Sequence, residues 1–144
     1  MRKIHLVSAA IALFLVFLAC KKTNSPAANA RTVQNFTGYY SLKDLKASIL
    51  GVTIDLYDSL PSCEQDNLIL LNANLTAQFI DTGTVCVPPT DSSGTWSLSQ
   101  NTDTLYIAGS ANFITSWDGT NLVLTGNQDV SGFTALVTTT LLKK

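Results

Sequence analysis

Apolar and polar residues alternate with a period of two along most of residues 37–144, and this alternation constrains the fold more than any other feature. In the stretch LTAQFID, residues 75–81, the apolar Leu75, Ala77 and Phe79 occupy every second position. The same period recurs in TLYIA (104–108) and in FTALVTTTL (133–141). Alternation of this kind, rich in Val, Ile, Thr and aromatic residues, is typical of strands with one buried face. The pattern predicts an all-β domain.

Turn residues separate the alternating runs, as at Asp118-Gly119, where glycine accepts the positive φ that a tight turn requires. We expect eight strands, near residues 37–46, 66–72, 75–81, 93–99, 103–108, 111–117, 120–125 and 131–142. Short connections between successive strands favour an antiparallel up-and-down order, and a sheet of eight strands removes its edges by closing. We therefore predict an antiparallel up-and-down eight-stranded barrel. A β-sandwich is the alternative, because it differs in topology more than in local pattern.

Residues 47–61, ASILGVTIDLYDSLP, fit the alternation less well. We expect an irregular segment with one helical turn, packed over one end of the barrel, and a lid is the alternative. Trp117, beside the Asp118-Gly119 turn, either caps an end of the barrel or lies exposed, and we favour the cap. The expected inward-facing set is Tyr40, Leu42, Leu70, Leu75, Phe79, Trp96, Leu98, Leu105, Ile107, Leu122, Leu124, Phe133 and Val137.

The N-terminus has the parts of a secretory signal peptide. Arg2 and Lys3 precede the apolar run 6–19, and this run of 14 residues is shorter than the roughly 20 needed to span a bilayer as a helix. The Ala19-Cys20 junction resembles the lipobox of bacterial lipoproteins, although Phe17 stands where that family prefers leucine. In that family the peptide is cut before the cysteine, which then carries lipid. A plain signal peptide, or an uncut anchor with an incidental cysteine, is the alternative.

The lipobox resemblance implies a signal peptide over residues 1–19 and a lipidated Cys20. We expect Cys20 to open a flexible tether over 20–36, which leaves one folded domain over 37–144. The tether composition, KKTNSPAANARTVQNF after Cys20, offers too little apolar surface to offset the entropy of ordering. The resemblance also implies a location in the bacterial cell envelope, with the membrane contacted through the lipid anchor.

The charge and composition of residues 37–144 exclude several functions. The chain's single histidine, His5, lies in the leader, and 37–144 also lacks arginine. Four lysines stand there against all ten carboxylates, a formal net charge of −6. Without clustered cations we expect no nucleic-acid partner. Without histidine we expect neither a serine or cysteine nucleophile with its usual base nor a histidine-ligated metal or cofactor.

Two cysteines, Cys63 and Cys86, remain in the domain. In an exported chain an even number of cysteines favours a disulfide, and two free thiols are the alternative. Glu64 and Asp66 share a strand face at a spacing of two, and paired carboxylates can act as acid and base. We favour a solvated or capping role for this pair, so we expect no catalytic residues, no metal and no enzyme activity.

Several short motifs resemble the bacterial lipocalin-like lipoprotein domains. They are GYYSL (38–42), a variant of the lipocalin G-x-W signature, then SCEQDNLILL (62–71), GTWSL (94–98) and TDTLYI (102–107), in that family's order. The resemblance implies a lipocalin-like barrel that can hold a small apolar molecule and a Cys63–Cys86 disulfide. Folding the hairpin about Ala73 also brings the two cysteines near each other.

A barrel of eight strands is wide enough either to be filled by its own side chains or to hold one small ligand. We favour the filled interior, and if a pocket exists, we expect Tyr40, Phe79, Trp96 and Phe133 to line it. The expected function is binding or sequestration of a small apolar ligand by a membrane-anchored, monomeric lipoprotein. The alternative is a structural or inhibitory envelope protein that acts through its outer surface without an internal ligand.

Overall fold

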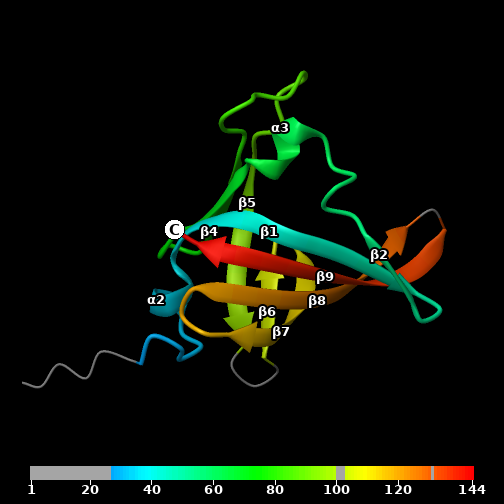
Figure 1. The fold of residues 1–144 in the computed structure, drawn as a ribbon. Helices are drawn as coiled ribbons and strands as arrows, with labels where there is room; N and C mark the ends of the chain where they lie inside the picture. Colours follow the sequence, from blue (N-terminus) through cyan, green and yellow to red (C-terminus); the bar gives the residue numbers. More distant parts are fainter. Residues whose placement is uncertain (1–26, 100–102, 131) are drawn as a thin grey trace, which may run out of the picture.

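The computed structural model describes residues 27–99, 103–130 and 132–144. Two one-turn helices, α2 (Val33–Phe36) and α3 (Ser62–Gln65), accompany the strands (Figure 1). The strands are β1 (Gly38–Ile49), β2 (Val52–Asp55), β3 (Leu68–Leu71), β4 (Thr76–Ile80), β5 (Ser92–Ser99), β6 (Thr104–Ile107), β7 (Ser110–Trp117), β8 (Asn121–Val130) and β9 (Phe133–Lys143).

Strand β1 closes the sheet by pairing with strands from both ends of the domain. It pairs with β3 over Gly38–Ser41 and with β9 over Tyr40–Ser48. From β3 to β9 each strand pairs with the next, always antiparallel. All strands except β2 thus form an eight-stranded closed barrel of lipocalin-like topology, which confirms the predicted fold class over the sandwich.

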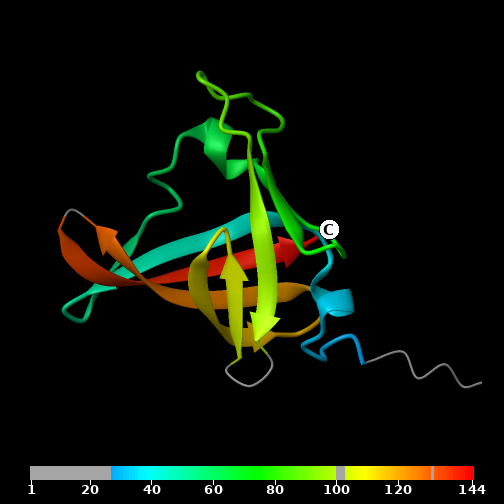
Figure 2. The same ribbon diagram turned by 180° about the vertical axis from the view of Figure 1, so that it is seen from behind.

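The barrel has two unlike ends. At the closed end, α2 lies directly before β1 and its Phe36 is fully buried. The chain ends beside it, because Lys143 pairs with Tyr40. At the open end lie the β1–β2, β4–β5, β6–β7 and β8–β9 connections. Figures 1 and 2 show the β1–β2 and β8–β9 hairpins projecting on the side away from α2.

Residues 27–36 pack against the closed end, although the sequence placed them in the tether. Thr32 caps α2 by accepting a hydrogen bond from the backbone N–H of Asn35 at 3.2 Å. The Asn35 amide donates to the carbonyls of Ala27 and Ala30, both at 2.8 Å, and Arg31 forms an ion pair with Asp103 at 2.7 Å. The packed chain therefore begins before the expected boundary at residue 37. Residues 20–26 lie outside the described residues.

The interior agrees with most of the expected inward set. Trp117 is also buried, as the cap interpretation predicted. Buried members of the expected set are Tyr40, Trp96, Leu105, Ile107, Leu122 and Leu124, and partly buried members packed against them are Leu42, Phe79 and Leu98.

Three members of the inward set were predicted wrongly as core residues. Leu70 pairs with Gln78 on the outer face, because the run LILL is apolar at every position and does not define a face. Leu75 is 40% exposed in the β3–β4 turn, where its φ is 66°. Phe133 is 61% exposed, because β9 begins beyond the closed part of the barrel.

The expectation of an irregular segment over residues 47–61 was wrong for its first half. Residues 47–55 complete β1, turn at Leu50-Gly51 and form β2, which is exposed along its whole length instead of packed over the barrel. The helical turn is α3, just after the segment.

Cys63 and Cys86 form the predicted disulfide, with a Cα–Cα distance of 5.2 Å. It joins α3 to the β4–β5 connection at the open end. In the chain-entropy model, closing a loop of this size contributes roughly 3 kcal/mol to the stability. The disulfide therefore ties the two long connections, 56–67 and 81–91, to each other.

Candidate functional site

The closed end of the barrel is filled by its own side chains. The rings of Phe36 and Trp117 lie 5.0 Å apart, centroid to centroid. The Tyr40 hydroxyl donates to the Phe36 carbonyl at 2.8 Å, and burial raises the pKa of Tyr40 far above its usual value. The Trp96 indole N–H donates to the Asn72 carbonyl at 2.9 Å. Tyr40 and Trp96, two of the expected ligand contacts, are thus committed to the core.

Lys143 holds the N-terminal segment on the closed end. Its ammonium donates to the Asn35 carbonyl at 2.6 Å and lies 5.9 Å from the centroid of Trp117. Burial lowers the pKa of Lys143, because partial removal from water disfavours the charged ammonium. Its contact with the Trp117 ring offsets part of this cost. The contact belongs to the packing of the closed end.

The other two expected ligand contacts lie apart from each other. Phe79 is partly buried and lines an open hollow of about 490 Å³ between β4 and β5. Phe133 lies on the β8–β9 hairpin, outside this hollow. The lining residues of the hollow are Gln78, Phe79, Ile80, Asp91, Ser92 and Ser93. The hollow is open to solvent, whereas small-molecule sites usually enclose most of the ligand. A small β-barrel of this kind is nevertheless compatible with ligand binding.

Carboxylates order the connections around the disulfide. Asp66 accepts from the backbone N–H of Thr84 at 2.9 Å. Asp81 accepts from the backbone N–H groups of Cys86 at 3.1 Å and of Thr90 at 2.9 Å. Asp66 therefore has a loop-holding role, and Glu64 lies in the first turn of α3. Among the described residues, no group of three or more His, Cys, Asp or Glu side chains has an arrangement that could hold a metal ion.

The largest feature that the sequence did not predict is an apolar strip at the open end. The strip comprises Ile49, Val52, Ile54 and Val137, together with Phe133, which lies on the same face of β9 beyond its last pair with β1, Ser48–Leu136. Register places Ile54 and Val137 on either side of Ala47, and Ile49 opposite Val52. Ala47 is buried and belongs to the inward face of β1. The strip therefore continues the barrel's inward face beyond the point where the barrel closes.

Solvent reaches most of this strip. The exposed fractions are 65% for Val52, 48% for Ile54 and 61% for Phe133. At the tip of the hairpin, Leu50 is 97% exposed. Apolar side chains gathered on one exposed face, in contrast to single scattered ones, mark interaction surfaces.

Leu50 also has an unfavourable backbone conformation. Its φ is 49° and that of Gly51 is 83°, so both central residues of the turn are left-handed. A two-residue hairpin of this type favours Asn-Gly, because a residue with a large side chain pays about 1–2 kcal/mol in that region. A leucine here gains nothing from burial in the described fold.

Charge is distributed unevenly along the barrel. Lys43 donates to Asn121 next to the closed-end turn, and Arg31, Lys143 and Lys144 also lie at the closed end. The connections and strand ends at the open end carry no lysine or arginine in the sequence. Their carboxylates are Asp55, Asp58, Glu64, Asp66, Asp81, Asp91 and Asp129.

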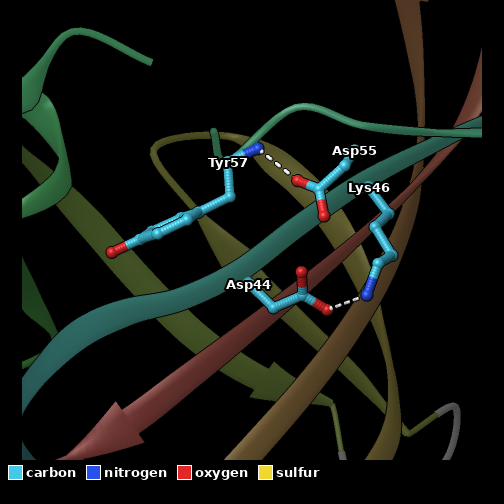
Figure 3. A network of polar contacts seen from close by, with 4 residues as sticks. All are labelled: Asp44, Lys46, Asp55 and Tyr57. Carbon is cyan, nitrogen blue, oxygen red and sulfur yellow. Dashed lines mark hydrogen bonds and ion pairs between the residues drawn. The ribbon is translucent and has the colours of Figure 1, made fainter. Parts of the chain in front are cut away.

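Lys46 is the cation nearest to the strip, and it is already paired. Its ammonium lies 2.7 Å from Asp44, and Figure 3 shows Asp55 beside it, accepting from the backbone N–H of Tyr57. The hydrogen bond that Lys46 donates to the Asp44 carboxylate raises the pKa of Lys46. Because Lys46 pairs with Asp55 in the sheet register, both point to the face opposite the strip. The open end is thus apolar on one face and acidic around it.

Comparison with known proteins adds no identification. The chain matches no protein-family model, and searches of curated proteins and of solved structures give no match to it. In the described part of the chain, no helix has the length and apolar character needed to cross a membrane.

Sequence reasoning missed the strip because it missed β2. The signal was present in ASILGVTI, residues 47–54, where the alternating runs ASI and VTI flank the dipeptide Leu50-Gly51. Leu-Gly is a weak hairpin signal, whereas Asn-Gly is a strong one. Leu50, which weakens the hairpin signal in the sequence, is the exposed residue with a left-handed backbone at the hairpin tip.

Replacing Leu50 with asparagine should stabilise the domain by about 1 kcal/mol, because asparagine tolerates the left-handed region better than leucine. For a domain of this size we expect a rise of about 4–8 °C in the melting temperature. Thermal unfolding followed by circular dichroism measures the change. An unchanged or lowered melting temperature would show that Leu50 makes stabilising contacts.

Proposed function

We propose that this protein is a lipid-anchored binding protein of the bacterial cell envelope whose barrel presents the open-end strip to an apolar partner. The observation that carries the proposal is the strip itself, where Val52, Ile54 and Phe133 lie exposed on one face. Leaving such a surface in water costs about 25 cal/mol for each Å² that a partner could cover. The role is one of interaction and involves no catalysis.

The filled closed end supports this function over an enclosed ligand. Tyr40 and Trp96, expected to line a pocket, hydrogen-bond to the protein's own backbone. The exposed apolar strip lies at the open end, where the inward face of the sheet continues beyond the closed wall. It suits a partner that approaches from solvent.

The charge distribution supports anchoring through the closed end. Residues 27–36 pack there, and the seven residues from Cys20 to Pro26 span at most about 25 Å when extended. A lipid on Cys20 therefore keeps the closed end, with Arg31, Lys43, Lys143 and Lys144, near the headgroups. The strip then faces away from that membrane, since β1 runs from the closed end to the hairpin over roughly 36 Å.

The anchor is tested with a Cys20→Ser variant of the full chain. We expect loss of metabolic labelling by palmitate and transfer of the protein from the membrane fraction to the soluble fraction. Retained labelling would contradict lipidation at Cys20. The Cys63→Ser and Cys86→Ser double variant is the control, because it also removes cysteine and should keep the label.

The strip is tested by photo-crosslinking in intact cells, with a photoreactive residue at position 52. We expect a discrete adduct that a Phe133→Ser substitution weakens. Phe113→Ser is the matched control, because Phe113 is 57% exposed on β7 and lies outside the strip. Equal loss with both variants, or no adduct at all, would contradict a binding role for the strip.

A small apolar ligand is a second candidate, favoured by the 490 Å³ hollow beside Phe79. Native mass spectrometry of the full chain, purified in mild detergent, should then show a bound molecule of constant mass. Ser92→Trp should displace it by filling the hollow. This candidate would be ruled out if the mass of the protein without ligand were the only one seen, both for protein purified from cells and for protein incubated with a mixture of neutral lipids.

A further inference from the structure

Strand β2 has one unpaired edge. It pairs with β1 on one side, and within the described residues no strand lies on its other side. The two-residue turn makes Ile49 and Val52 a hydrogen-bonded pair, so such pairs alternate along the hairpin. The bond from Leu56 N–H to the Leu45 carbonyl, at 2.8 Å, continues this alternation. The backbone groups of Thr53 and Asp55 therefore point to the open edge.

The side chains of β2 also suit an added strand. Val52 and Ile54 lie on the strip, and Thr53 and Asp55 lie on the opposite face. A strand placed beside β2 would set every second side chain against Val52 and Ile54, which are 65% and 48% exposed. Main-chain hydrogen bonds would supply affinity and the alternating pockets would supply specificity.

A second free edge of the same sheet is less suitable. The register of β8 with β7 stops at Thr125, and Gly126 is still buried against Ala111 and Asn112, so the free edge of β8 begins at Asn127. It carries Asn127, Gln128 and Asp129 before Val130. Amides and a carboxylate are poor strand formers and blunt an edge against pairing, whereas β2 has Val, Thr and Ile before Asp55.

Charge distinguishes between the occupants that such an edge could take. Asp55 and Asp58 lie at the end of β2, and the surrounding connections are acidic. A second copy of this chain would bring like charges together, and an anionic lipid surface would be repelled. A segment with lysine or arginine at the positions facing Asp55 is complementary.

We propose that the outer edge of β2 binds an extended polypeptide segment as an added strand, with apolar residues against Val52 and Ile54 and basic residues beside Asp55. This inference rests on the proposed function and names the partner of the same strip. The exposed Leu50 at the hairpin tip supplies a further apolar contact next to the edge.

The test measures binding of a labelled peptide of alternating valine and lysine to the full chain by fluorescence anisotropy. We expect saturable binding that weakens as salt rises, because the charges are exposed. Thr53→Pro removes the outward N–H while sparing the β1–β2 bonds, and an edge strand tolerates proline. Loss of the Thr53 N–H should weaken peptide binding about tenfold.

Thr53→Val is the matched control, because both variants lose the 2.8 Å contact between the Thr53 and Ser48 hydroxyls but only proline loses the N–H. We expect binding by Thr53→Val within about twofold of the parent. Equal weakening by both variants would overturn strand addition. Asp55→Asn keeps the acceptor for Tyr57 and should weaken binding about threefold, which keeps the test valid if the proline variant unfolds.

Two further peptides and one physical measurement separate the other occupants. A valine–glutamate peptide, and a valine–lysine peptide with its residues in two blocks, should not bind, and binding as strong as that of the alternating peptide would overturn the inference. Dimerisation of the chain in sedimentation, lost in Thr53→Pro, would assign the edge to a second copy instead. If the position-52 adduct forms in cells but survives Thr53→Pro, the proposed function stands and strand addition fails.

Discussion

The pairing of β1 with β9 over Tyr40–Ser48 turns an antiparallel meander into a barrel, and the other features of the structure depend on it. Because β1 also pairs with β3 at one end and with β2 at the other, a single strand sets both the closure and the hairpin. Closure buries Tyr40 and Leu141, which are 0% and 1% exposed. It also leaves β2 outside the barrel, with a free edge.

A bulge in β1 makes this pairing compatible with a buried interior. The register shifts between Leu42 and Asp44, so that Leu42 pairs with Leu141 and Leu45 pairs with Thr139. The extra residue, Lys43, lets both leucines point inward while its own side chain reaches Asn121. Beyond the bulge the inward alternation runs through Ala47 into the exposed hairpin. The same face is therefore core at one end of β1 and exposed apolar surface at the other.

The two ends of the molecule have different physical roles. At the closed end, aromatic packing of Phe36 and Trp117 and the partly buried Lys143 hold the N-terminal segment on the barrel. At the open end, carboxylates and the disulfide order long connections, and apolar side chains remain in water. Leu50 combines near-complete exposure with a left-handed backbone at the tip of the β1–β2 hairpin. This contrast is why the proposed partner is placed at the open end.

The sequence by itself predicted eight antiparallel strands that close into a barrel, because alternation and turn residues are local signals, and it predicted the Cys63–Cys86 disulfide from an even number of cysteines and a family resemblance. It did not predict β2. The leader, Cys20 and the cell-envelope location stay predictions. Only the tertiary structure decided that Tyr40 and Trp96 are filled core, that Phe133 is exposed and that residues 27–36 belong to the packed domain. Each of these depends on where a strand ends relative to the closed wall, which alternation along a single strand does not encode. The free edge of β2 was also decided only by the tertiary structure. Leu50-Gly51 is a weak turn signal in the sequence, and the pairing of β2 with β1 is what shows that the chain turns there.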